Sequence, residues 1–114
     1  MNFTYLSEFE KDLKRLLKRY ISLNEDLNKI KLILEVYPDA RPPFSFILFN
    51  KLNERSIVKI KKIACLSLRG KGVNTGLRII YMFNHQLNSI EFIELYHKND
   101  QSTEDQNRFI HLMK

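Results

Sequence analysis

The sequence contains one cysteine, Cys65, and no long apolar run. A single thiol cannot form an intrachain disulfide, so the chain needs no oxidising compartment. The opening stretch "MNFTYLSEFEKDLKR" lacks the apolar core of a signal peptide, and no later run approaches the ~20 apolar residues of a membrane-spanning helix. These absences predict a cytoplasmic protein that does not cross a membrane.

Glycine is also scarce, and all three glycines lie within residues 70–76. Glycine permits positive φ angles, so the simplest interpretation of "RGKGVNTGLRIIY" is a long hairpin loop that leads into a strand. Such a loop does not require the cations Arg69, Lys71 and Arg78 that share this stretch. A Walker-type phosphate loop is excluded because no Gly-Lys-Ser/Thr run is present. Anion binding by side chains is left as an open interpretation.

The charge balance is basic. The 114 residues carry 19 Lys and Arg against 13 Asp and Glu, which gives a net charge of +6 and a pI near 9.5. This length predicts one domain over residues 1–114. The charge favours an acidic partner: nucleic acid is the commonest, and an acidic protein or an anionic membrane surface would satisfy the same charge. The histidines and the cysteine do not have a recognisable zinc spacing.

Apolar residues recur at helical intervals in the first third of the chain. Ser7 and Glu10 have the spacing of a capping box, which predicts that a helix begins near Ser7. A second helix runs from Leu23 to Tyr37 and is stopped by Pro38. Because the two amphipathic segments are close in sequence, we expect a helical hairpin. The cations on the first helix are interpreted as a solvated face.

The rest of the chain is rich in β-forming residues. "SIVKIKKIACLSL" predicts a strand in which Lys62 breaks the alternation and marks a bulge. "GLRIIYMF" and "SIEFIELYH" predict two further strands in an antiparallel hairpin. "FSFILFNKL" is compatible with a short strand or an apolar loop, and "QSTEDQNRFIHLMK" predicts a closing helix capped by Ser102 or Thr103. Helices followed by strands indicate an α+β fold with an antiparallel sheet.

Several of these segments together resemble the RelE/ParE superfamily of toxin–antitoxin toxins. The resemblance is closest to HigB-like and RelE-like members and covers most of the chain. It rests on "SEFEKDLKRLLKRY", the lysine-rich strand, "GKGVNTGLRIIY", "IEFIELYHKND" and the short final helix. It implies an N-terminal helical hairpin packed on a small twisted antiparallel sheet, with a short C-terminal helix.

The resemblance also implies a function. RelE-like toxins cut messenger RNA on the ribosome with the message's own 2′-hydroxyl as nucleophile, assisted by basic residues and without a metal or other cofactor. We therefore expect a metal-independent endoribonuclease that inhibits translation and is held inactive by a cognate antitoxin protein. ParE members poison DNA gyrase instead. A gyrase inhibitor and a non-catalytic RNA- or antitoxin-binding module are the alternatives.

The residues that the resemblance assigns to the site lie near the glycine-rich loop and the strand ends. Arg78 matches the arginine of the family's Gly-x-Arg strand and is expected to bind the scissile phosphate. The expected catalytic residues are Arg78, Lys71, His97 and Lys98, and the expected RNA-binding residues are Lys59, Lys61, Lys62, Arg69 and Tyr96.

Two observations limit these assignments. An alternative role for Arg78 is an ion pair with Glu91 or Glu94 across the sheet. The C-terminal arginine and tyrosine pair of RelE is not evident, because Arg108 is present but no tyrosine follows Tyr96. The chain therefore departs from the strict RelE pattern at its C-terminal end.

Overall fold

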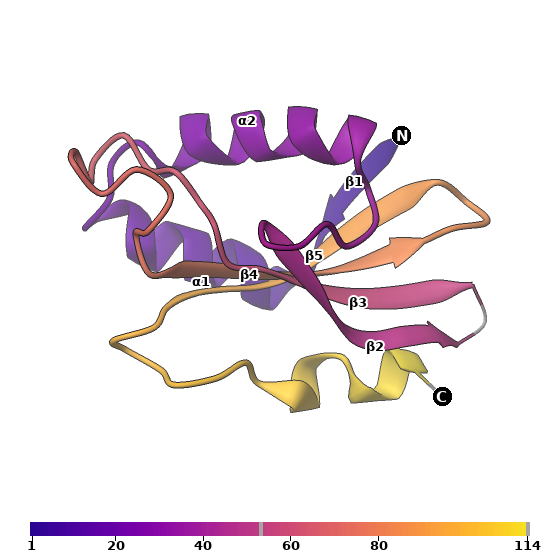
Figure 1. Ribbon diagram of the computed structural model, residues 1–114. Coiled ribbons are helices and arrows are strands. Elements are labelled where there is room, and N and C mark those ends of the chain that lie inside the picture. Colours follow the sequence, from indigo (N-terminus) through magenta and orange to yellow (C-terminus); the bar gives the residue numbers. More distant parts are fainter. Residues whose placement is uncertain (53, 114) are drawn as a thin grey trace.

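Five strands and two α-helices make up the structure, a computed structural model that describes residues 1–52 and 54–113 (Figure 1). The elements in chain order are β1 (Asn2–Tyr5), α1 (Ser7–Leu17), α2 (Leu23–Val36), β2 (Ser45–Leu52), β3 (Arg55–Ile60), β4 (Leu77–Asn84), β5 (Ser89–His97) and two 3-10 helices, Gln106–Arg108 and Ile110–Met113. The strands form one sheet in the order β1-β5-β4-β3-β2. The predicted α+β class is confirmed. Neither helix in the described part of the chain is long and apolar enough to span a membrane.

The sheet is mixed rather than wholly antiparallel. β1 lies parallel to β5 at one edge, with Phe3 aligned with Ile90, whereas the other neighbouring strands are antiparallel. The antiparallel prediction is wrong here because a four-residue strand is too short to show a clear alternation. Tertiary packing holds β1 in place: the rings of Phe3 and Tyr5 stack on Phe92 at centroid distances of 5.9 and 5.4 Å.

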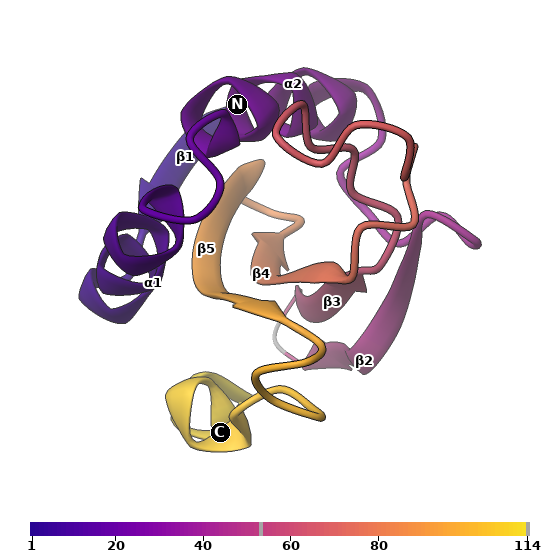
Figure 2. The ribbon, with the colours of Figure 1, turned by 90° about the vertical axis from the view of Figure 1, so that its left-hand side faces the viewer.

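Both helices cover the same face of the curved sheet (Figure 2). α1 begins at Ser7, as predicted, but its N-cap is Leu6 and no side chain caps it. The predicted capping box is therefore wrong, and the Ser7 hydroxyl donates to the Glu8 carboxylate instead, at 3.2 Å. α1 packs mainly against β5 and only lightly against α2, so the two consecutive helices do not form a tightly packed hairpin.

The main core lies between the helices and the sheet. Phe9 of α1, Leu34 of α2, Tyr81 of β4 and Phe92 of β5 are all fully buried in it. The Tyr81 hydroxyl is buried with its ring and donates to the carbonyl of Pro38 at 2.7 Å. This bond ties the segment after α2 to the centre of the sheet.

The segment "FSFILFNKL", which the sequence leaves open, forms the edge strand β2. β3 ends at Ile60, and the N–H groups of Lys61 and Lys62 both donate to the carbonyl of Phe44, at 3.0 and 3.4 Å, so two residues oppose one at the predicted bulge before the chain leaves the sheet. The departure has a packing cause, because the side chains of Ile63 and Cys65 are buried in the core on the helix side. Residues 61–76 therefore form a long loop between β3 and β4.

The C-terminal segment covers the second face of the sheet (Figures 1 and 2). The predicted closing helix is present only as two short 3-10 helices, and the predicted cap at Ser102 or Thr103 is wrong. The first 3-10 helix is capped by Asp105, whose carboxylate accepts from the N–H of Asn107 at 3.1 Å. Phe109 is fully buried in a second apolar cluster on this face.

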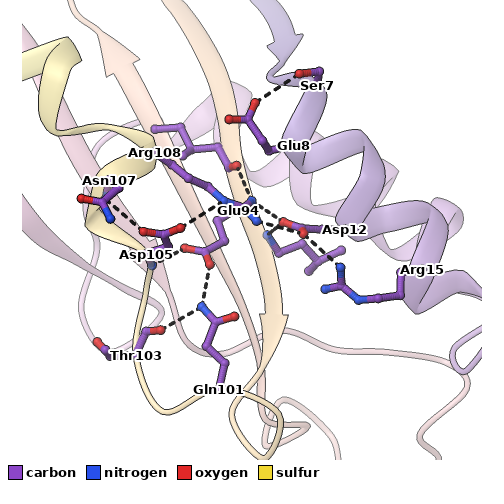
Figure 3. A network of polar contacts seen from close by, with 12 residues as sticks. Ser7, Glu8, Asp12, Arg15, Glu94, Gln101, Thr103, Asp105, Asn107 and Arg108 are labelled. Atoms are coloured by element: carbon purple, nitrogen blue, oxygen red, sulfur yellow. Dashed lines mark hydrogen bonds and ion pairs between the residues drawn. The ribbon is translucent and has the colours of Figure 1, made fainter.

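A polar network fastens this segment to α1 and β5 (Figure 3). Arg108 donates to both carboxylate oxygens of Asp12, at 2.6 and 3.2 Å, and Asp12 is almost completely buried. Glu94 of β5 accepts from the side-chain amide of Gln101 at 2.6 Å and from the N–H of Asp105 at 2.8 Å. These bonds hold the chain in an extended path before the 3-10 helices, which explains why no regular helix forms there.

Candidate functional site

A hollow of about 300 Å³ opens where the start of β2, the end of β3, the start of β4 and the end of β5 meet. The described residues that line it are Pro43, Phe46, Lys61, Lys62, Asn74, Gly76, Arg78 and Lys98. Four of these are cations, and none is acidic. We call this hollow the cationic pocket.

Strand pairing brings the cations of the pocket together. β3 and β4 are aligned so that Ile60 is opposite Ile79, which places Lys61 beside Arg78 at the same end of the sheet. Lys98 directly follows β5, and its N–H donates to the carbonyl of Gly76 at 2.9 Å. Residues far apart in the sequence therefore converge on one site.

Arg78 is half-buried and is held by backbone carbonyls. Its Nη1 donates to the carbonyls of Lys61 and Leu77, each at 3.1 Å. Neither of the glutamates that the sequence suggests as partners is aligned with Arg78: Glu94 lies opposite Ile80 in the β4–β5 pairing and Glu91 lies further along the strand. Among the described residues no carboxylate forms an ion pair with the guanidinium, so its positive charge is not compensated.

Two of the pocket lysines, Lys61 and Lys62, are likewise placed by neutral groups. The Lys62 ammonium donates to the side-chain oxygen of Asn74 at 2.9 Å. The Lys61 ammonium lies over the ring of Phe46, 5.1 Å from its centroid. These contacts position the charges without neutralising them.

His97, an expected catalytic residue, does not line the pocket. It is buried beside the helices, where its ring stacks on Tyr20 with centroids 6.1 Å apart. Its Nδ1 accepts from the N–H of Asn99 at 3.1 Å, so in the neutral ring Nε2 carries the proton and donates to the carbonyl of Thr75 at 2.9 Å. Both ring nitrogens are engaged, which makes His97 a positioning residue for the loop and not an acid or base in the pocket.

The loop passes so close to His97 that only glycine fits at residue 76. Gly76 has φ of +85°, and a Cβ atom there would lie 2.8 Å from Nε2 of His97. The glycine therefore has a defined role: it lets the loop cross the end of β5 and enter β4 immediately before Arg78.

Lys59 and Tyr96, both expected to bind RNA, lie under the C-terminal segment. The Lys59 ammonium is paired with the Glu104 carboxylate at 2.8 Å. Burial is the largest single influence on the pKa of Lys59 and lowers it, but the hydrogen bonds and charges of Glu104 and Tyr96 together outweigh burial, so the pKa lies above its ordinary value. Tyr96 is 2% exposed, and burial raises the pKa of its hydroxyl. Neither residue is accessible to a large ligand in this structure.

Arg69 and Lys71 are exposed on the long loop and do not line the pocket. Arg69 borders a separate shallow hollow of about 210 Å³ that also includes Lys29 and Asp26. Of the nine expected site residues, the pocket thus contains Arg78, Lys61, Lys62 and Lys98.

Four uncharged lining residues have no counterpart among the expected ones: Pro43, Phe46, Asn74 and Gly76. The alignment of β2 with β3, which brings Phe46 next to Lys59 in the sheet, is set by tertiary packing and leaves no signal in the sequence. In the residues that the structure describes, no group of three or more His, Cys, Asp or Glu is arranged to hold a metal ion.

Comparison with known proteins finds relatives by structure only. No family profile and no curated protein matches the sequence. A chain of the archaeal RelE–RelB complex from Pyrococcus horikoshii OT3 is 17% identical with a TM-score of 0.60, and the match covers 85% of this chain and 93% of that chain.

Two structures from Helicobacter pylori are similar as well. The conserved hypothetical protein HP0892 is 20% identical with a TM-score of 0.55, over 88% of this chain and 97% of that one. A metal-bound toxin is 18% identical with a TM-score of 0.54, over 89% and 98%. The three matches span nearly the whole length of each matched chain, and they show that this chain has the fold of the RelE-like toxins.

Proposed function

We propose that the chain is the toxin of a toxin–antitoxin pair and that it inhibits translation by cleaving messenger RNA on the ribosome. The observation that carries this proposal is the cationic pocket, in which Arg78, Lys61 and Lys62 are held by neutral groups and keep their charge for an anion. A phosphodiester suits such a site, because a guanidinium binds two phosphoryl oxygens at once. The RelE-like fold supports the same assignment.

In this proposal the message supplies its own nucleophile. The 2′-hydroxyl gives its proton to water and attacks the adjacent phosphorus. The new O–P bond closes a 2′,3′-cyclic phosphate, and the bond from phosphorus to the 5′-oxygen of the next nucleotide breaks. Negative charge grows on the phosphoryl oxygens in the transition state, where Arg78 donates to them and the lysines supply further positive charge.

The proton for the leaving oxygen comes from a lysine. None of the described residues that line the pocket is a histidine or a carboxylic acid. The ammonium groups of Lys61, Lys62 and Lys98 are therefore the candidate proton donors. Arg69 and Lys71, on the exposed loop, extend the positive surface and bind further phosphates of the message.

The proposed partners are the ribosome with its message and a cognate antitoxin. An antitoxin that holds this toxin inactive covers the cationic pocket, and the net charge of +6 favours an acidic segment for that purpose. The similarity to a chain of a RelE–RelB complex supports a partner of this kind.

Expression of the chain without an antitoxin tests the proposal. We expect growth arrest, new 5′ ends within translated messages, and intact DNA. Arg78→Ala should abolish the growth arrest and the new 5′ ends, whereas Lys14→Ala, which removes an exposed cation from α1, should abolish neither. DNA breakage without message cleavage would identify a gyrase inhibitor instead, and normal growth with intact messages would leave only a non-catalytic binding module.

A further inference from the structure

Phe46 is an aromatic residue that neither core of the protein uses. Its side chain is partly exposed on β2, and it belongs to neither of the two apolar clusters that the described residues form. Other phenylalanines near it are used for packing: Phe44 packs against the main core and Phe49 against the second cluster. The fold therefore does not explain why residue 46 is aromatic.

The position of Phe46 in the cationic pocket suggests an explanation. Phe46 and Pro43 form the apolar part of the lining, and the remaining lining residues include the four cations. A site that combines one exposed ring with several uncompensated cations matches the two halves of a nucleotide: a base has a flat face that stacks, and its phosphate is an anion.

The size of the pocket limits what enters it. Its volume of about 300 Å³ is at the lower end of the range for small-ligand sites, roughly 300–1,000 Å³. This space suits one nucleotide rather than a base-paired helix, and a base is free to stack on a side chain only where it is not already stacked in a duplex.

We propose that Phe46, flanked by Pro43, is the stacking platform for one unpaired base of the RNA whose phosphate is bound by Arg78. This inference rests on the proposed function for the identity of the ligand, and it adds the residue that binds the base. The Lys61 ammonium, which lies over the Phe46 ring at 5.1 Å, moves to the phosphate when the nucleotide enters, and the base takes its place over the ring.

Binding measurements on the full-length protein without ribosomes test the platform. The probes are a labelled single-stranded RNA pentamer and a set of pentamers with one abasic nucleotide at each position in turn. Stacking of a base on an aromatic side chain changes affinity by roughly 5- to 100-fold. We expect one abasic position to weaken binding by about that factor. Phe46→Leu should bind the complete and the abasic pentamer equally, whereas Phe46→Tyr should keep the difference in affinity between them.

Two controls separate stacking from damage to the fold. Phe46→Leu keeps an apolar side chain at the site, and its thermal unfolding is compared with that of the unchanged protein. Ile47→Ala alters the neighbouring exposed residue of β2 and should leave the abasic difference unchanged. The inference is overturned if the protein does not bind the pentamer or if no abasic position weakens binding. It is also overturned if Phe46→Leu distinguishes the complete from the abasic pentamer as well as the unchanged protein does.

The experiments distinguish failure of the stacking platform from failure of the proposed function. If the protein stacks a base through Phe46 but cuts no message on ribosomes, the stacking platform is supported and the nuclease proposal is refuted. If the protein cuts messages but binds abasic and complete pentamers equally, the nuclease proposal is supported and the stacking platform is refuted.

Discussion

The replacement of Arg78 by alanine is the most direct test of the cationic pocket. In the structure one nitrogen of the guanidinium, Nη1, is bonded to the carbonyls of Lys61 and Leu77. In the proposed reaction the remaining N–H groups face the phosphoryl oxygens. Loss of one preorganised donor to a developing oxyanion lowers a rate by ~10²–10³-fold. We expect the single-turnover rate of message cleavage on purified ribosomes to fall by that factor.

The effect of Arg78→Ala on stability should be small. The substitution removes two bonds to neutral carbonyls, and each such bond contributes about 1 kcal/mol net. Because residue 78 is only half-buried, water can reach part of the site. We therefore expect the free energy of unfolding to fall by no more than about 2 kcal/mol, as measured by urea denaturation. Arg78→Lys keeps the charge but not the two-pronged geometry, and should recover only part of the rate.

Two results would refute this reasoning. If Arg78→Ala folds normally and cleaves at the original rate, the guanidinium takes no part in the reaction. If Lys14→Ala, on the surface of α1, slows cleavage as much as Arg78→Ala does, the loss reflects overall charge and not the pocket.

Three further predictions concern the framework of the site. Asp12→Ala removes the buried carboxylate to which Arg108 donates twice and should lower the free energy of unfolding in urea by about 3 kcal/mol. A double variant that removes both side chains should lose clearly less than the sum of the single losses. Gly76→Ala should lower the melting temperature by several degrees, because its Cβ would clash with His97 and its φ is positive, whereas a melting temperature equal to that of the unchanged protein would contradict the close approach. Burial raises the pKa of Glu94 in the folded protein, whereas in the unfolded chain it has the ordinary value of about 4.3. The free energy that Glu94 contributes to stability is therefore lost as the pH rises from that value through the raised pKa. Relative to the unchanged protein, Glu94→Gln should therefore become more stable in urea between pH 4 and neutrality, and a difference independent of pH would contradict this prediction.

The sequence predicts the parts of the fold that local patterns determine. The start of α1 at Ser7 and the hairpin of β4 and β5 follow from apolar periodicity and a short polar connection. β1 and the course of the chain after Ile60 depend on tertiary packing: Phe3 reaches Phe92, and Ile63 enters the core. Contacts between residues so far apart leave no periodic signal.

The site was predictable to a similar extent. The cations near the glycine-rich loop indicate anion binding, and four of the nine expected residues do line one pocket. Strand geometry could have excluded one assignment in advance, since neighbouring residues of a strand face opposite sides and Tyr96 and His97 cannot both serve the same face. The place of Phe46 in the pocket was not predictable, because it depends on the alignment of β2 with β3.

The partners of the pocket cations differ from those of the two cations that hold the C-terminal segment in place. Lys59 and Arg108, which hold the C-terminal segment in place, are each paired with a carboxylate, as expected of cations that serve the fold. Arg78, Lys62 and Lys61 contact two carbonyls, an amide oxygen and an aromatic ring respectively. Like charges brought together without counter-charges repel one another, so this arrangement opposes folding. Within residues 1–52 and 54–113, the fold pairs Lys59 and Arg108 with carboxylates and leaves Arg78, Lys61 and Lys62 without one. The pocket therefore stays positively charged, and an anionic ligand that binds there reduces the repulsion between the three cations.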